Sequence, residues 1–145
     1  MTPATAHAAV MARLVAAGLT KSLSPLGVRN ESNQRINQSF AVTPMSVAPS
    51  PSPGRSQPTV AGVRVVQTFR IELGHRVKPG DGQDAPTAAL TDTHTAMRYL
   101  AVNATSLTSA GAIEFGPSTL AYEGNGAFLV TTFNFLVTYN LTLVV

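Results

Sequence analysis

The C-terminal segment, residues 127–145, alternates apolar and polar side chains and contains no charged residue, Pro or Gly. Leu129 and Phe133 fall on one parity, whereas Asn134 and Thr138 fall on the other. A period of two predicts a β-strand with one buried face. At ~3.3 Å per residue the segment would reach roughly 60 Å, well beyond the usual strand of about 5–6 residues. We therefore expect the strand to bend, to break at a bulge, or to extend and pair with a neighbouring subunit.

A second alternating segment covers residues 60–78. Its odd positions are mostly apolar, as at Phe69 and Ile71, and its even positions are mostly polar or basic, as at Arg70. This pattern predicts a strand with one buried and one solvated face. Because its length matches that of the C-terminal strand, the two are expected to pair over much of their extent.

Shorter patterns predict the remaining elements. Thr2 and Pro3 are typical of a helix start, and an Ala-rich amphipathic run carrying Val10, Met11, Leu14 and Val15 follows, ending near Gly18. A strand is predicted over 36–47, where Pro44 restricts it to a sheet edge or a bulge. A helix is predicted from Thr87 or Thr91 to about Ala104, with inward-facing residues Leu90, Met97, Leu100 and Ala101. A short strand pair over 112–115 and 120–123 precedes a turn over 124–126.

The order of these elements predicts an α+β fold, a mostly antiparallel sheet with helices packed on one face and long strands or a hairpin extending towards neighbouring subunits. With 145 residues, the chain is expected to form a single domain over 1–145. Residues 48–58 are rich in Pro and Ser, which predicts an extended loop. That loop is interpreted as a long hairpin connection or as a protrusion that contacts a partner.

Charged residues are sparse, at 12% of the chain against the ~25% typical of soluble domains. Such a surface is either covered by other subunits or simply neutral and polar. The chain has no Cys, which excludes disulfides, thiolate metal sites and Cys nucleophiles.

The net charge of +3 is unevenly distributed: residues 1–80 carry nine Lys and Arg against two Glu, and residues 81–145 carry one Arg against five carboxylates. In the second strand the basic residues share one parity, which predicts a basic face opposite the core. We expect this face to contact the acidic half of an adjacent copy. The predicted interface residues are Arg64, Arg70, Arg76, Lys78, Asp81, Asp84, Asp92 and Glu123.

The sequence carries no recognisable catalytic, cofactor-binding or metal-binding motif. His75 and His94 have no His or carboxylate partner at ligand spacing and are interpreted as ordinary surface histidines. Residues 80–84 resemble an Asp-rich calcium loop but lack its regular ligand spacing and closing Glu, so they are interpreted as a turn and helix cap. The expectation is a protein that is not an enzyme and needs no cofactor. No secretory signal is convincing, and the C-terminal alternation favours a sheet over a membrane span.

One resemblance rests on most of the chain. A short N-terminal helix precedes a strand, a long loop and a strand ending in Ile71-Glu-Leu-Gly-His-Arg-Val-Lys-Pro79; an Asp-bearing turn, a helix with Asp92 and Met97-Arg-Tyr-Leu100, and the closing strand Phe128–Tyr139 follow. This order resembles the tail terminator (tail-completion) proteins of long-tailed bacteriophages. The loop over 48–58 is longer and richer in Pro than that family leads one to expect.

The resemblance implies a structural virion protein: a homo-oligomeric ring, expected to be a hexamer, that caps the tail tube and joins it to the head–tail connector. Its implied partners are the tail tube protein, the connector protein and DNA passing through the lumen without sequence recognition, with no membrane. It also implies assembly in the host cytoplasm and a final place at the head-proximal end of the virion tail. Three alternatives stay open. The first is a head–tail connector, stopper or minor tail protein, and the second is a basic nucleic-acid-binding module using the face of Arg64, Arg70, Arg76 and Lys78. The third is a small enzyme with an unrecognised site, which a deep pocket lined with His75 or His94 would support.

Overall fold

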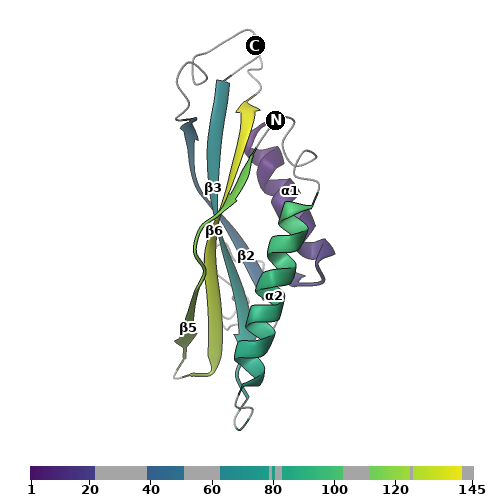
Figure 1. Ribbon diagram of the computed structural model, residues 1–145, viewed down its shortest axis with the longest axis vertical. Helices are drawn as coiled ribbons and strands as arrows, with labels where there is room; N and C mark the ends of the chain where they lie inside the picture. Colours follow the sequence, from purple (N-terminus) through teal and green to yellow (C-terminus); the bar gives the residue numbers. More distant parts are fainter. Residues whose placement is uncertain are drawn as a thin grey trace.

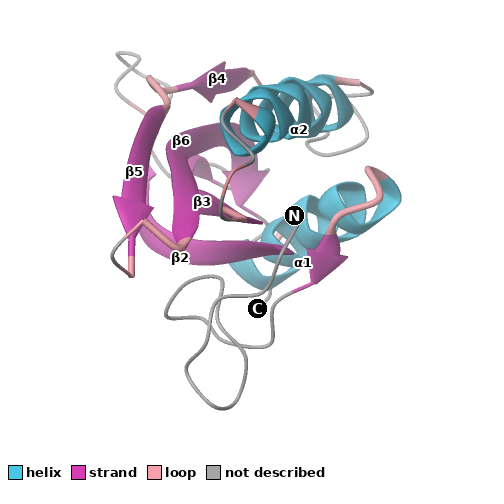
Figure 2. Ribbon diagram, turned by 90° about the horizontal axis from the view of Figure 1, so that it is seen from below, coloured by secondary structure: helices cyan, strands magenta, loops and turns pink. Residues whose placement is uncertain are grey.

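The computed structural model describes residues 1–21, 39–50, 63–78, 80, 83–102, 112–124 and 126–141. Within these ranges the chain forms a twisted six-stranded sheet, with two helices on one of its faces (Figures 1 and 2). The expected α+β fold with a mostly antiparallel sheet is therefore confirmed. The elements are α1 (Pro3–Ala16), β1 (Thr20–Lys21), β2 (Ser39–Pro49), β3 (Val63–Arg76), α2 (Asp84–Ala101), β4 (Ile113–Phe115), β5 (Thr119–Glu123) and β6 (Phe128–Leu141).

Strands β3 and β6 form the centre of the sheet. They pair antiparallel along their whole described length, from Val63 opposite Leu141 to Arg76 opposite Phe128, with no shift in register. Odd positions of both strands face the helices, so that Phe69 and Phe135 are paired and fully buried. The pairing and the predicted parity are both confirmed, although each described strand has 14 residues, fewer than its alternating segment.

Shorter strands flank this central pair. On one side β2 pairs antiparallel with β3, and its register shifts between Pro44 and Ser46, which confirms the prediction of an edge position or a bulge at Pro44. β1 pairs parallel with the start of β2 only. On the other side β4 and β5 each pair with β6, and not with each other as predicted. Residues 116–118 separate them, and the Gly116 amide donates to the Asn134 carbonyl of β6 at 2.9 Å.

The two helices cover the odd face of the sheet through narrow stripes of mostly small residues. The capping box predicted in part at Thr2 is complete, since the Thr2 hydroxyl and the Thr5 side chain each bind the other residue's backbone. Helix α1 buries Ala6, Val10 and Leu14. Helix α2 buries Ala85, Ala89, Thr93, Ala96 and Leu100. The Ala side chains in the stripe of α2 leave room for that helix to lie close to the sheet.

Two sequence predictions about helix faces are wrong. Leu90 was expected to point inward, but its side chain is 61% exposed, and Ala101 is exposed as well. The stripe that faces the sheet begins at Ala85 and Ala89, and Leu90 lies about 100° further round the helix. Helix α2 also begins at Asp84, before the predicted start. On the first helix, Val15 is half exposed.

The predicted loop over 48–58 needs a partial correction. Ala48 and Pro49 belong to β2 and pair with Val66 and Val65. Residues 51–58 lie outside the described part of the chain, as do 36–38, 60–62, 104 and 142–145 of the predicted elements.

Polar contacts connect elements that are far apart in sequence. The buried Tyr139 hydroxyl of β6 donates to Gln67 Oε1 of β3 at 2.7 Å, and Gln67 Nε2 donates to the Pro3 carbonyl of α1 at 3.4 Å. One Arg13 guanidinium nitrogen donates to the Tyr99 carbonyl at 3.0 Å and also to the Val102 carbonyl. Arg13 therefore places a positive charge at the C-terminus of α2, where the helix dipole favours it.

The opposite faces of β3 predict opposite outcomes for the same substitution at neighbouring positions. Phe69→Asp places an unpaired carboxylate in the core and should lower the free energy of unfolding by more than about 4 kcal/mol, enough to prevent folding. Thr68→Asp lies on the outer face and should cost within about 1 kcal/mol. Urea unfolding and soluble yield measure the difference; equal stability of the two variants would contradict the assigned register.

Burial raises the pKa of Tyr139 above its ordinary value of 10.0. The unfolded chain therefore releases this proton at a lower pH than the folded chain does. The contribution of the protonated Tyr139 hydroxyl to the free energy of unfolding is complete below about pH 10 and is lost as the pH rises towards the folded pKa. We expect Tyr139→Phe to cost about 1–3 kcal/mol near pH 8, because Gln67 Oε1 loses its donor. The cost should shrink above about pH 10.

Denaturant unfolding across this pH range tests the prediction. Tyr122→Phe is the matched control, because it removes only the hydroxyl of an exposed side chain and should change the free energy of unfolding little. If the free energy of unfolding of Tyr139→Phe ran parallel to that of the wild type at all pH values, Tyr139 would make no contribution to the pH dependence of stability.

Candidate interaction surface

The predicted basic residues of β3 lie on the outer face of the sheet, opposite the helices. Arg64, Arg70 and Arg76 share even parity, and no register shift interrupts the strand between them. Arg64 and Arg76 stand twelve residues apart, which corresponds to about 40 Å along a strand. Lys78 is exposed beyond the end of β3. The four cations therefore form a widely spaced row along the molecule, and the structure does not bring them together in one patch.

Acidic groups interrupt this row. Glu72 follows Arg70 on the same face of β3, and Glu114 of β4 is exposed on the outer face, opposite Leu136. Arg70 Nε and Glu72 Oε2 are both buried atoms without a hydrogen-bond partner among the residues that the structure describes. Buried polar atoms of this kind are usually satisfied, so these two atoms are exceptions on the outer face of β3.

The predicted acidic residues have different surroundings. Asp84 is the exposed first residue of α2, and Glu123 ends β5 and is partly exposed. Asp92 binds a histidine of its own chain, described below, so it is not the free carboxylate that the sequence interpretation requires. Asp81 lies outside the described residues.

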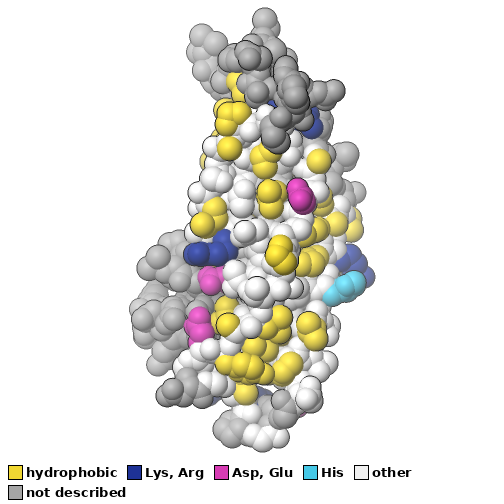
Figure 3. Space-filling view, turned by 60° about the vertical axis from the view of Figure 1, so that its left-hand side comes forward, with side chains coloured by type: hydrophobic (Ala, Val, Ile, Leu, Met, Phe, Trp, Pro, Cys, Tyr) yellow, Lys and Arg dark blue, Asp and Glu magenta, His cyan; other side chains and the backbone are white. Residues whose placement is uncertain are grey.

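Apolar side chains are exposed along both borders of the sheet, a feature that the sequence reasoning missed. On β2, Met45 is 52% and Val47 44% exposed; on β5, Leu120 is 41% and Tyr122 59% exposed. Figure 3 shows hydrophobic side chains gathered over the lower part of the visible face; β5 lies in the lower half of Figure 1. A signal was available, because neither 39–50 nor 119–122 contains a charged residue.

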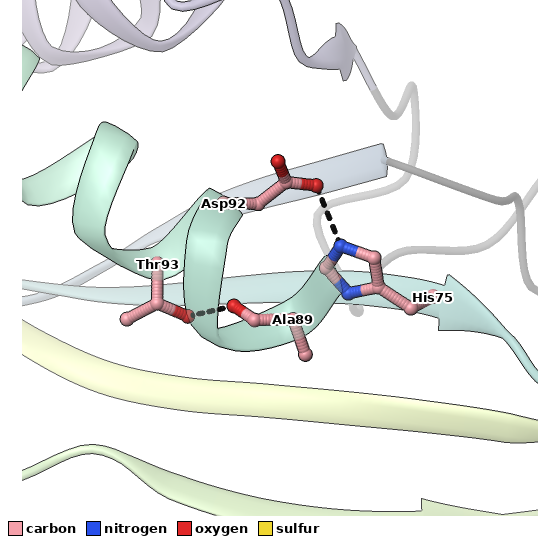
Figure 4. Close-up of polar contacts among 4 residues, drawn as sticks. All are labelled: His75, Ala89, Asp92 and Thr93. Carbon is pink, nitrogen blue, oxygen red and sulfur yellow. Dashed lines mark hydrogen bonds and ion pairs between the residues drawn. The ribbon is translucent and has the colours of Figure 1, made fainter. Parts of the chain in front are cut away.

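His75 and Asp92 form a contact that corrects the interpretation of His75 as a surface residue. Figure 4 shows the His75 imidazole on β3 facing the Asp92 carboxylate on α2, with Nε2 2.7 Å from Oδ2. The His75 side chain is 2% exposed and that of Asp92 21%. On the next residue of α2, the buried Thr93 hydroxyl donates to the Ala89 carbonyl at 2.7 Å, inside the helix.

Parity is the signal that could have located His75. It is an odd residue, like Phe69, Ile71 and Leu73, and therefore lies on the helix side of β3. His94, in contrast, is exposed, as predicted. His75 Nδ1 is buried and has no hydrogen-bond partner in the described ranges. Since the imidazole is enclosed, the pair has the geometry of a structural link between α2 and β3.

Among the described residues, no three His, Asp or Glu side chains gather closely enough to hold a metal ion. Neither helix in this part of the chain has the length and apolar character needed to cross a membrane.

A comparison of the chain with protein-family models and with curated proteins finds no match.

Removing both partners of the His75–Asp92 pair should cost less than the sum of the costs of removing each alone. Asp92→Ala leaves a buried imidazole with no partner, so we expect a loss of about 1–3 kcal/mol in the free energy of unfolding. His75→Leu combined with Asp92→Ala should be less destabilised than the sum of the single variants, with a coupling energy of about 0.5–3 kcal/mol. Denaturant unfolding of the four proteins gives this value.

His94→Ala is the control on the same helix, because His94 is exposed and should change stability by less than about 0.5 kcal/mol. Strict additivity of the two single substitutions would show that the 2.7 Å contact contributes no coupling.

Proposed function

We propose that this protein is a structural subunit of a closed ring that caps the tail tube of a long-tailed bacteriophage and joins it to the head–tail connector. The ring is a homo-oligomer, proposed as a hexamer, at the head-proximal end of the virion tail, and it assembles in the host cytoplasm. The tail tube protein and the connector protein are its proposed partners. DNA passes through its lumen and contacts it without reading of base sequence. The subunit has no catalytic role.

The observation that carries the proposal is the apolar exposure along two different borders of one sheet. Met45 and Val47 lie on β2, and Leu120 and Tyr122 lie on β5, on the far side of β3 and β6. Two unlike surfaces on opposite borders are what a head-to-tail interface requires, and such an interface closes into a ring when its rotation divides a full turn. The order of helices and long strands resembles that of the tail terminator family, and this resemblance supports a ring that caps the tail tube.

The distribution of charge favours assembly over nucleic-acid recognition as the main role of the outer face. Proteins that bind nucleic acid concentrate Lys and Arg in a patch or stripe. Here Arg70 has Glu72 beside it on the same face, and Arg64 and Arg76 stand at opposite ends of β3. A connector, stopper or minor tail protein would use the same borders and differ only in its place along the tail.

Native mass spectrometry of the purified chain tests the ring. We expect one closed species, with the mass of six subunits of 15.1 kDa, to dominate at micromolar concentration or to form when purified tail tubes are added. Negative-stain images should show rings at one end of each tube. A chain that stays monomeric in both conditions would overturn the proposal.

Charge reversal separates the proposal from its alternative. Arg70→Glu and Arg76→Glu should reduce ring formation or tube capping, because the outer face loses positive charge that a partner's carboxylates would meet. If assembly and capping survive unchanged while binding to DNA collapses, and if wild-type DNA binding falls steeply with salt, the nucleic-acid module replaces the ring subunit.

A further inference from the structure

The border of the sheet formed by β2 is uncovered over most of its length. β1 pairs only with Ser39 and Phe40, so residues 41–49 have no strand beyond them in the described structure. All of 44–49 are exposed, and this half of β2 contains Met45 and Val47 but no charge. Pro44 and Pro49 lack the amide proton needed to donate to a further strand. Contacts at this border therefore depend mainly on side chains.

The opposite border is formed by β4 and β5. Among the described residues both strands pair only with β6, and Thr119, Leu120, Ala121 and Tyr122 are all exposed. Leu120 stands opposite Thr131, and Tyr122 opposite Leu129. Thr131 and Leu129 are buried on the helix side of the sheet, so Leu120 and Tyr122, which stand opposite them, face the same side.

At both borders, exposed apolar side chains lie on the helix side of the sheet. Val47 stands opposite the buried Gln67, so its side chain faces the helix side, like Leu120 and Tyr122. On the outer face, residues 65–69 of β3, which pair with 44–49, carry no charge. Arg64 and Arg70 lie just beyond the two ends of this stretch, with Glu72 following Arg70, whereas the charged residues of 112–124 are Glu114 and Glu123.

We propose that β2 of one copy lies along the β4–β5 border of the next copy, with residues 44–49 as its contact segment. Apolar side chains then meet on the helix side of the sheets, and Arg64 and Arg70 meet Glu114 and Glu123 on the outer side. Unlike-charge juxtaposition across an interface sets its orientation and register. The inference rests on the proposed ring, because it names the two surfaces that the ring would join.

The strand directions suit this arrangement. β2 is antiparallel to β3, and β3 is antiparallel to β6, so β2 and β6 run in the same direction. β4 and β5 run against β6. With the helices of both copies on the same side, β2 therefore approaches the β4–β5 border of the next copy in the antiparallel sense. Each copy contributes two different borders, so the interface is head to tail.

The absence of Cys from the chain permits a direct test by single-cysteine crosslinking. One set of proteins carries Met45→Cys or Val47→Cys, and the other carries Leu120→Cys or Tyr122→Cys. Each member of the first set is mixed with each member of the second, left to assemble, and treated with a short bismaleimide. We expect at least one mixture to give a crosslinked dimer that neither of its single variants gives alone. Leu90→Cys, an exposed apolar position on α2, is the control and should not crosslink with either set.

The outcomes keep this inference separate from the proposed function. Rings by native mass spectrometry with no heterotypic crosslink in any mixture would overturn the assigned borders and leave the ring standing. Efficient crosslinking of one variant with itself would indicate a two-fold interface and overturn both. Monomer at all concentrations, with and without tail tubes, would also overturn both.

A second variant pair measures the energetic role of the border. Leu120→Glu should weaken association at least about tenfold, because it buries a carboxylate in the apolar part of the interface. Leu90→Glu is the matched control and should assemble like the wild type. Thermal unfolding shows whether each variant is folded; a folded Leu120→Glu protein with wild-type association would overturn the proposal.

Discussion

The uninterrupted register between β3 and β6 is the constraint on which the rest of this structure depends. Fourteen residues of each strand are paired, so the parity of every side chain along about 45 Å of sheet is set at once. A slip of one residue would exchange the buried face for the solvated one. The placement of both helices follows from this register, because their buried stripes pack against the continuous apolar face that runs through Phe69 and Phe135.

The length of the central pair also explains why the borders of the sheet are incomplete. β1, β4 and β5 have two, three and five residues, so none can cover a strand of fourteen. β2 is long enough, but its second half extends past β1. Uncovered strand borders expose backbone groups and apolar side chains that proteins usually protect. A subunit with such borders on both sides is well suited to addition of further copies.

Polar contacts hold the layers together at a few points. His75 and Asp92 attach α2 to β3, the Tyr139–Gln67 pair leads to the start of α1, and Arg13 joins α1 to the end of α2. Each contact joins residues from different elements. These contacts therefore fix where the helices lie and contribute little to the internal stability of each helix. A sheet face with few charges can then remain available for contacts with other molecules.

Several features could be predicted from sequence because they depend on local periodicity. A period of two identified β3, β6 and their buried faces, and Thr2 with Pro3 marked the start of α1. The rows of basic side chains on the outer face followed from the same parity. Local signals therefore determined most of the fold and the side of the sheet on which the candidate surface lies.

Tertiary packing decided the rest. The contact between His75 and Asp92 joins positions seventeen apart on different elements, which no spacing rule indicates. Leu90 is exposed because close helix–sheet approach favours the Ala stripe over the larger side chain. β4 and β5 both pair with β6 because that strand offers a border longer than either, whereas their nearness in sequence suggested a hairpin. The exposed borders depend on relative strand lengths, which only the assembled sheet sets.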